Sequence, residues 1–164
     1  MIKRTFAAFL ILSLVFALAS CGGDKTFGHC ELRIPLSDGF SERDAEGFDV
    51  AYSNGDLAVA ILRISFAAGY DEGIPETLMP NEFAAYYLYR TDRRAEIVSE
   101  YDFAYYEFSE SYESGEYYHL MSFYRSKWAY FAVLFSSREE MREVSRGIFL
   151  EYADAAYFVE YEEN

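Results

Sequence analysis

Phe103 to Phe135 reads FAYYEFSESYESGEYYHLMSFYRSKWAYFAVLF, and this stretch predicts three consecutive β-strands joined by tight turns. The strand segments are rich in aromatic and β-branched residues and lack Pro and Gly; they cover residues 105–108, 117–124 and 128–135. Polar turn residues separate them at 113–116 and 125–127. Both alternating faces of the last segment are apolar, which is typical of a sheet that is covered on each side.

Weaker strand signals flank this stretch, at residues 31–36, 48–52, 57–66, 96–99 and 156–159. The last of these segments fits a short strand or an extended chain equally well. Asn54-Gly55, between two of the segments, is a strong hairpin signal. Pro35 cannot donate a hydrogen bond to a ladder, so it favours an edge position or a strand end.

Two helices are predicted from apolar side chains that recur at helical spacing. The first follows Pro80 and covers Asn81 to Arg90. The second has one apolar stripe formed by Met141, Val144, Ser145, Ile148, Phe149 and Tyr152. Together with the strands, they predict an α+β fold in which helices cover both faces of an antiparallel sheet.

The start and the middle of the second helix carry further signals. Two overlapping capping-box spacings precede it, Ser136 with Glu139 and Ser137 with Glu140. Gly147 weakens the helix by about 1 kcal/mol relative to Ala, unless close packing requires the small residue.

The N-terminus has the layout of a secretory signal peptide, because Lys3-Arg4 precede a short apolar run from Phe6 to Ala19. This run is too short to span a bilayer comfortably. Leu18-Ala19-Ser20-Cys21 resembles the lipobox of bacterial lipoproteins, which implies cleavage before Cys21 and a lipid on its sulfur. The alternative is an ordinary cleaved signal peptide. We expect residues 1–20 to be the signal, 21–28 a tether and 29–164 a single globular domain.

The charge balance disfavours nucleic acid as a partner. The full chain has a formal charge of −14, and Lys3 and Arg4 are the only charged residues before Cys21, so the mature chain carries −16. Phosphate backbones are bound by clustered Lys and Arg. Repulsion would also keep most of the domain off an anionic lipid surface, which leaves the acyl chains to hold it there.

Residues with catalytic or metal-binding potential form no recognised motif, so we predict no enzyme activity, cofactor or metal. A Ser-His-Asp arrangement would have to use His29 or His119, and a hydrogen-bonded structural role explains His119 as well as catalysis does. Cys30 is the only thiol left beside a lipidated Cys21, and a structural role is favoured. The loop with Asp38, Glu42, Asp44 and Glu46 lacks EF-hand spacing, so a solvated acidic loop is favoured over a Ca²⁺ site.

Residues 67–79 are the longest segment without periodicity, and connections of this length are often functional. Tyr70, Asp71 and Glu72 place an aromatic ring beside two carboxylates, between the flexible positions Gly69 and Gly73. We predict that these three residues contact a partner. The alternative is a disordered loop, and most of the 16 Tyr residues are explained by packing between core and water.

The order of these features resembles the PsbP-like family, whose members are α/β/α sandwiches around an antiparallel sheet. The resemblance rests on residues 32–40, the Asn54-Gly55 hairpin, the aromatic helix after Pro80 and residues 124–135 before the last helix. It implies a non-enzymatic binding or accessory module. None of these stretches is a chemical motif, so the resemblance assigns no residue a role.

We therefore expect a membrane-anchored extracytoplasmic lipoprotein that binds another envelope protein or a cell-wall glycan. Two alternatives stay open. One is an envelope hydrolase with an unrecognised acidic site, and the other is a structural subunit of a membrane complex.

Overall fold

The computed structural model describes residues 32–159. Its main sheet consists of β2 (Ser41–Arg43), β3 (Val50–Ser53), β4 (Leu57–Ser65), β5 (Val98–Ser99), β6 (Ala104–Tyr112), β7 (Gly115–Arg125) and β8 (Ala129–Arg138). The short strands β1 (Leu32–Arg33) and β9 (Tyr157–Phe158) pair only with each other within this part of the chain. The helices are α1 (Phe66–Asp71), α2 (Pro80–Thr91), the 3-10 turn η1 (Glu139–Met141) and α3 (Arg142–Asp154).

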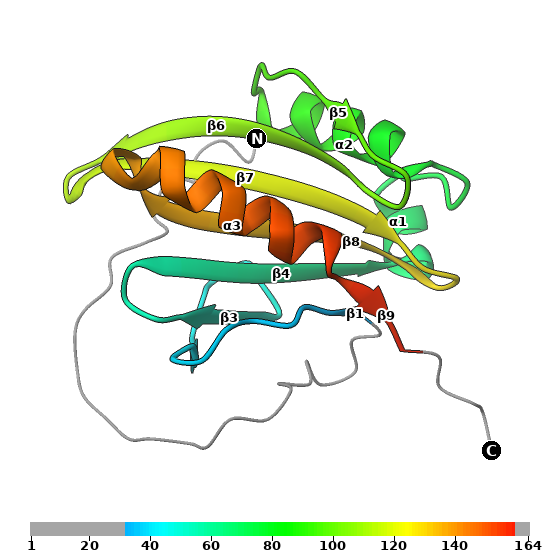
Figure 1. Cartoon of the computed structure of the whole chain (residues 1–164). Coiled ribbons are helices and arrows are strands. Elements are labelled where there is room, and N and C mark those ends of the chain that lie inside the picture. Colours follow the sequence, from blue (N-terminus) through cyan, green and yellow to red (C-terminus); the bar gives the residue numbers. More distant parts are fainter. Residues whose placement is uncertain (1–31, 160–164) are drawn as a thin grey trace.

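The seven strands of the main sheet are antiparallel and follow the order β2-β3-β4-β8-β7-β6-β5. Helix α3 crosses one face, and α2 covers the β5–β7 part of the other (Figure 1). The predicted α+β fold with helices on both faces is therefore confirmed. Within residues 32–159, no helix combines the length and the apolar character needed to cross a bilayer.

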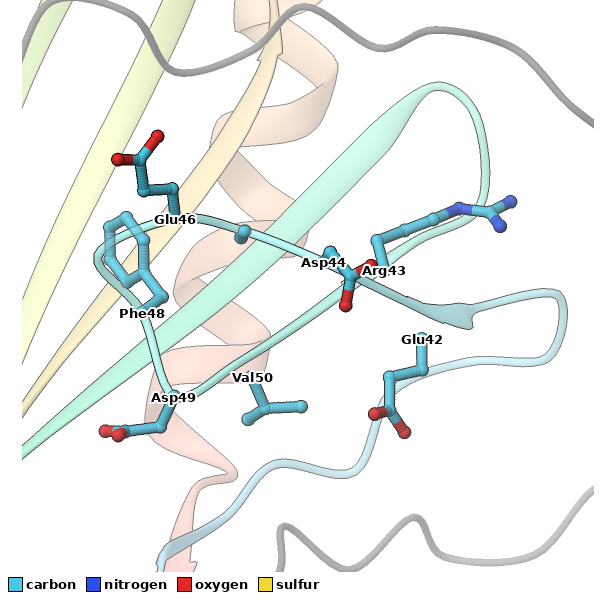
Figure 2. Close-up of a pocket in the computed structure, with 8 residues that line it drawn as sticks. Glu42, Arg43, Asp44, Glu46, Phe48, Asp49 and Val50 are labelled. Carbon is cyan, nitrogen blue, oxygen red and sulfur yellow. The ribbon is translucent and has the colours of Figure 1, made fainter.

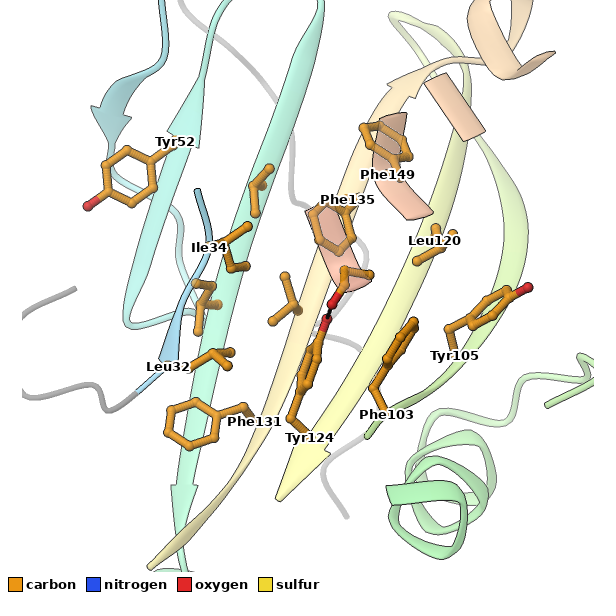
Figure 3. Packing of buried hydrophobic residues seen from close by; sticks show 14 of the residues in the cluster. Leu32, Ile34, Tyr52, Phe103, Tyr105, Leu120, Tyr124, Phe131, Phe135 and Phe149 are labelled. Carbon is orange, nitrogen blue, oxygen red and sulfur yellow. Dashed lines mark hydrogen bonds between the residues drawn. The ribbon is translucent and has the colours of Figure 1, made fainter. Parts of the chain in front are cut away.

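The core under α3 is built from aromatic rings. The Phe149 ring stacks on Phe135 at a centroid distance of 5.4 Å (Figure 3). The same ring stacks on Tyr118 at 6.0 Å. The Tyr124 hydroxyl donates to the Ala153 carbonyl at 2.9 Å, which joins β7 to the end of α3. Each of these hydroxyl and ring contacts fixes the helix along the sheet, so α3 cannot slide without losing several at once.

The core under α2 is equally aromatic. Phe83 stacks on Tyr130 at 4.4 Å and meets Phe123 edge to face at 5.6 Å. The Tyr130 hydroxyl donates to the Pro75 carbonyl at 2.7 Å. This bond connects the segment before α2 to the sheet. It also gives the Tyr130 hydroxyl, the polar end of a buried ring, a hydrogen-bond partner.

The central strands and the hairpin at Asn54-Gly55 form as predicted, and Gly55 adopts the left-handed backbone that the turn requires. Three boundaries differ. The first predicted strand is only Leu32–Arg33 and ends before Pro35. The acidic loop contains a strand, β2, which joins the sheet edge. Trp128 lies in the β7–β8 turn rather than in β8, because the strand begins at Ala129.

The capping-box prediction for the last helix is wrong. Strand β8 continues through Ser136 and Ser137, whose side chains point to opposite faces and are both buried. The Ser136 Oγ atom bonds His119, and the Ser137 Oγ atom bonds Ser145 of α3 at 2.7 Å. Within the described chain, α3 begins after η1 without a side-chain cap.

The buried face of α3 also differs in part from the predicted stripe. Ser145 and Phe149 are buried as expected, but Ala153 is buried too and Val144 is exposed. Gly147 faces open space, since a Cβ built there would meet no heavy atom of the described chain within 4 Å. Close packing therefore does not explain this glycine.

Candidate functional site

Tyr70, Asp71 and Glu72 lie at the end of α1 rather than in an extended loop. The Ser65 Oγ atom accepts a hydrogen bond from the Ala68 N–H at 3.2 Å and so caps the helix. The aperiodic segment therefore shrinks to residues 72–79. Tyr70 is 81 % exposed, and its two acidic neighbours are exposed as well.

Gly69 is not the flexible position that the sequence suggested. It is buried within α1, and an added Cβ would lie 3.4 Å from the Ile74 Cβ atom. The Gly69 carbonyl accepts the Ile74 N–H at 2.7 Å. Gly69 therefore permits close packing of the following loop on the helix, and Gly73, with its φ of +79°, makes the turn between them.

Helix α1, the 72–79 loop and the β7–β8 turn are joined by direct contacts. The Phe66 N–H donates to the Trp128 carbonyl at 3.0 Å. The Arg125 guanidinium donates to the Glu76 carbonyl at 3.0 Å and lies 5.3 Å from the Phe66 ring centroid. The predicted contact residues therefore lie on a helix that is held in place by the β7–β8 turn and the 72–79 loop.

The β5–β6 turn lies at the same end of the sheet, because Phe103 stacks on Tyr124 of β7 at 5.6 Å. We call this surface the turn end: α1, residues 72–79, the β5–β6 turn and the β7–β8 turn (Figure 1). Three large aromatic side chains on it are exposed, Tyr70 at 81 %, Tyr101 at 99 % and Trp128 at 62 %.

Sequence reasoning did not identify Tyr101 or Trp128 as surface residues. Trp128 continues the apolar pattern of β8, so the pattern assigned it to the strand. The only signal for its exposure is its place next to Ser126-Lys127, two residues typical of turns. For Tyr101, the signal that could have placed it in a surface turn is its position between the charged residues Glu100 and Asp102.

The acidic loop forms a shallow hollow that is lined by Glu42, Arg43, Asp44, Ala45, Glu46, Phe48, Asp49 and Val50 (Figure 2). The Asp49 carboxylate is already used, because its Oδ2 atom accepts the Arg63 N–H at 2.6 Å. Across residues 32–159, no three His, Cys, Asp or Glu side chains are grouped so that they could hold a metal ion. Asp38 does not line the hollow, so the four predicted acidic residues do not converge.

His119 lies inside the sheet rather than at an open site. Its side chain is 1 % exposed, and its Nδ1 atom is 2.8 Å from the Ser136 Oγ atom. The ring stacks on Phe108 at 4.8 Å. Burial lowers the pKa of His119 to about 4. The geometry supports the hydrogen-bonded structural role that the sequence left open beside catalysis.

Cys21, Cys30 and His29 fall outside the described residues, so the structure places none of the three. No protein-family model and no curated protein matches the chain.

A solved structure does match. The solution structure of cyanobacterial PsbP (CyanoP) from Synechocystis sp. PCC 6803 aligns with a TM-score of 0.56 and 13 % identity. The alignment covers 87 % of this chain and 99 % of that one. Identity this low shows the fold alone. The chain has the PsbP-like fold that the layout of its sequence resembles.

Proposed function

We propose that this protein is a lipid-anchored extracytoplasmic lipoprotein that works as a non-enzymatic binding or accessory module of the cell envelope. The lipobox-like stretch from Leu18 to Cys21 supports the anchor, since a multi-chain lipid holds a protein stably at a membrane. The observation that carries the binding role is the exposure of Tyr70, Tyr101 and Trp128 together at the turn end.

Exposed aromatic side chains are a feature of recognition surfaces, because a large ring gives contact area with little loss of side-chain freedom. Tyr70 stands on a capped helix, and its neighbouring carboxylates of Asp71 and Glu72 add charge that a basic or hydroxyl-rich partner can meet. A contact patch on a braced scaffold loses little conformational entropy on binding.

A second candidate function is favoured by the hollow of the acidic loop. Glu42, Asp44 and Glu46 line it with exposed carboxylates, and paired carboxylates perform acid–base work in many hydrolases. Within residues 32–159, no hydrogen bond or ion pair positions any of these three carboxylates, so the binding role is the better supported of the two.

Fatty-acid labelling in growing cells tests the anchor. The wild-type protein should incorporate an alkyne-tagged fatty acid, and Cys21→Ala should not. Cys30→Ala is the matched control, because it removes the other thiol and should keep the label. Label on the Cys21→Ala protein would overturn the lipoprotein assignment.

Activity screening tests the second candidate function. Glycan, ester and peptide substrates of the envelope would be offered to wild type and to a Glu42→Gln/Asp44→Asn/Glu46→Gln variant. The binding role predicts no turnover by either protein. Turnover that the triple substitution abolishes would establish a hydrolase.

A further inference from the structure

We propose that Asn54 is a self-modifying site. The folded β3–β4 turn promotes attack of the Gly55 backbone nitrogen on the Asn54 side chain, which converts Asn54 to aspartate and isoaspartate with water as the only co-reactant. The site lies at the end of the sheet opposite the turn end, because β4 begins there beside Ser137 and reaches the β7–β8 turn only at Ser65. The inference is therefore independent of the anchor and of the binding role.

The turn leaves the attacking nitrogen open. The Asn54 N–H donates to the Leu57 carbonyl at 3.1 Å and closes the hairpin around Gly55 and Asp56. Gly55 has a φ of +101°, which suits the first central position of a type II′ turn. A Cβ at Gly55 would meet no heavy atom of the described chain within 4 Å, and residues 54–56 are exposed. No side chain of the described residues therefore shields the Gly55 nitrogen from the Asn54 carboxamide.

Two backbone N–H groups bind the oxygen of the carboxamide that is attacked. The Asn54 Oδ1 atom accepts the Asp56 N–H at 3.1 Å and the Leu57 N–H at 2.8 Å. Negative charge develops on this oxygen when a nitrogen adds to Cγ. Preorganised donors at hydrogen-bond distance stabilise such a charge, as they do in an oxyanion hole. The turn therefore makes the Asn54 Cγ atom a better electrophile than it is in an unfolded chain.

A serine hydroxyl binds the proton that the attacking nitrogen must lose. The Ser53 Oγ atom accepts the Gly55 N–H at 3.0 Å. Ser53 is 7 % exposed and pairs with Ala58 across the hairpin, so the sheet holds its hydroxyl in place. A hydrogen-bond acceptor at this proton polarises the N–H bond and assists its transfer to solvent hydroxide.

The reaction balances without any other reactant. The Gly55 nitrogen forms a bond to the Asn54 Cγ atom, and the bond from Cγ to Nδ2 breaks. The Nδ2 atom leaves as ammonia with the equivalent of the proton lost by the Gly55 nitrogen, and a cyclic succinimide remains. Water then opens the ring. Opening at Cγ gives aspartate, whereas opening at the backbone carbonyl carbon gives isoaspartate, whose main chain runs through the side-chain carbon.

Conversion to isoaspartate changes the edge of the sheet. The extra main-chain carbon lengthens the turn, whereas the bond from Asn54 to Leu57 and the pairing of Ser53 with Ala58 depend on the length of the turn. Strand β3 is also the strand that joins β2 to the sheet. The modification therefore weakens the β2–β3 edge as the molecule ages.

Peptide mapping by mass spectrometry measures the reaction. Purified full-length protein would be incubated near neutral pH, either folded or unfolded in guanidinium, and then sampled over days. Replacement of the amide by a carboxyl group shows in the peptide mass, and chromatography separates isoaspartate from aspartate. We expect Asn54 to be lost several-fold faster in the folded protein, because the three hydrogen bonds exist only there. Asn81, exposed on α2 and followed by Glu82, is the internal control and should stay largely intact.

Variants at two serines test the hydroxyl. Ser53→Ala removes the acceptor of the Gly55 N–H and should slow the loss of Asn54 several-fold, and Ser53→Thr should restore the rate. Ser41→Ala is the matched control, because the Ser41 Oγ atom donates to the Ser53 carbonyl and does not contact Gly55. This variant alters the same edge of the sheet and should keep the wild-type rate. Urea unfolding checks that each variant is folded.

Three results would overturn the inference. A rate in the folded protein that is equal to or below the rate in guanidinium would show that the turn restrains Asn54 rather than promoting the attack. Equal rates for wild type and Ser53→Ala would overturn the role of the hydroxyl. Formation of aspartate without isoaspartate would indicate direct hydrolysis of the side-chain amide, with no succinimide.

Discussion

The Nδ1 atom of His119 on β7 lies 2.8 Å from the Oγ atom of Ser136, its register partner on β8. The Nε2 atom of the same ring is buried and has no hydrogen-bond partner within the described residues. Glu110, Arg93 and Glu139 are the charged groups that influence the ring. A protonated imidazole would be poorly accommodated, since burial penalises its charge more than the two carboxylates compensate.

Stability should therefore fall as pH decreases from about 6.5 to about 4. The unfolded chain protonates His119 near the ordinary pKa of 6.5, whereas the folded protein resists protonation until about pH 4. The unfolded state thus binds more protons in this window, and the free energy of unfolding should drop by up to about 1.4 kcal/mol per pH unit. Urea unfolding at several pH values measures the slope.

The variant His119→Asn isolates this contribution, because the amide can still meet Ser136 but does not titrate. Its slope between pH 6.5 and pH 4 should be shallower than that of wild type, and the remaining slope reports the carboxyl groups. Equal slopes for the two proteins would show that His119 is not the group responsible.

Truncation of Phe149 should destabilise the domain strongly. The ring is fully buried against Phe135 and Tyr118, so Phe149→Ala should cost about 3 to 5 kcal/mol in the free energy of unfolding. Val144→Ala on the same helix is the control; this residue is 66 % exposed and should change stability by less than about 0.5 kcal/mol. A cost below about 1 kcal/mol for Phe149→Ala would contradict the packing of α3 on the sheet.

Replacement of Gly147 by Ala should stabilise the protein. Gly147 lies inside α3 with a helical backbone, and the space where a Cβ would stand is open. The effect of the substitution on stability is therefore set by the low helix propensity of glycine. The gain should be about 0.5 to 1 kcal/mol in chemical unfolding. Gly69→Ala is the informative contrast, because its Cβ would lie 3.4 Å from the Ile74 Cβ atom, at the short limit of van der Waals contact, and this variant should gain less than Gly147→Ala.

The predicted contact residues can be tested by crosslinking in native membranes. Tyr70→Ala/Asp71→Ala/Glu72→Ala should reduce partner capture while the unfolding midpoint stays near that of wild type, because all three side chains are exposed. The control is Glu140→Ala/Glu143→Ala/Val144→Ala, which removes two exposed acids and one exposed hydrophobic residue at the other end of the sheet. Unchanged capture by the first variant would move the contact away from α1.

The sequence predicted those elements whose signal is local. Runs of aromatic and β-branched residues between polar turns placed β6, β7 and β8 within a few residues, and Asn54-Gly55 placed the β3–β4 hairpin, because strand propensity and turn chemistry are properties of neighbouring residues. Helical spacing likewise located α2 and α3. The cover on both faces followed from the apolar character of both faces of β8.

Tertiary contacts decided the roles of individual polar residues and glycines. Ser136 and Ser137 match a helix cap by spacing, yet both belong to strand β8. Their side chains bond His119 and Ser145, which come from segments that no local pattern connects to these serines. The sequence suggested that Gly69 is a flexible position. In the structure Gly69 packs on Ile74, and this contact depends on how the following loop returns to α1.

The candidate site shows the same division. Its chemistry at Tyr70, Asp71 and Glu72 could be predicted from the sequence, because an aperiodic segment between two apolar elements stands out locally. Trp128 and Tyr101 could not be assigned to the same surface from the sequence. Antiparallel pairing of β6 with β7 and the bond from Phe66 to Trp128 bring three distant turns to one end of the sheet, and only long-range register determines that.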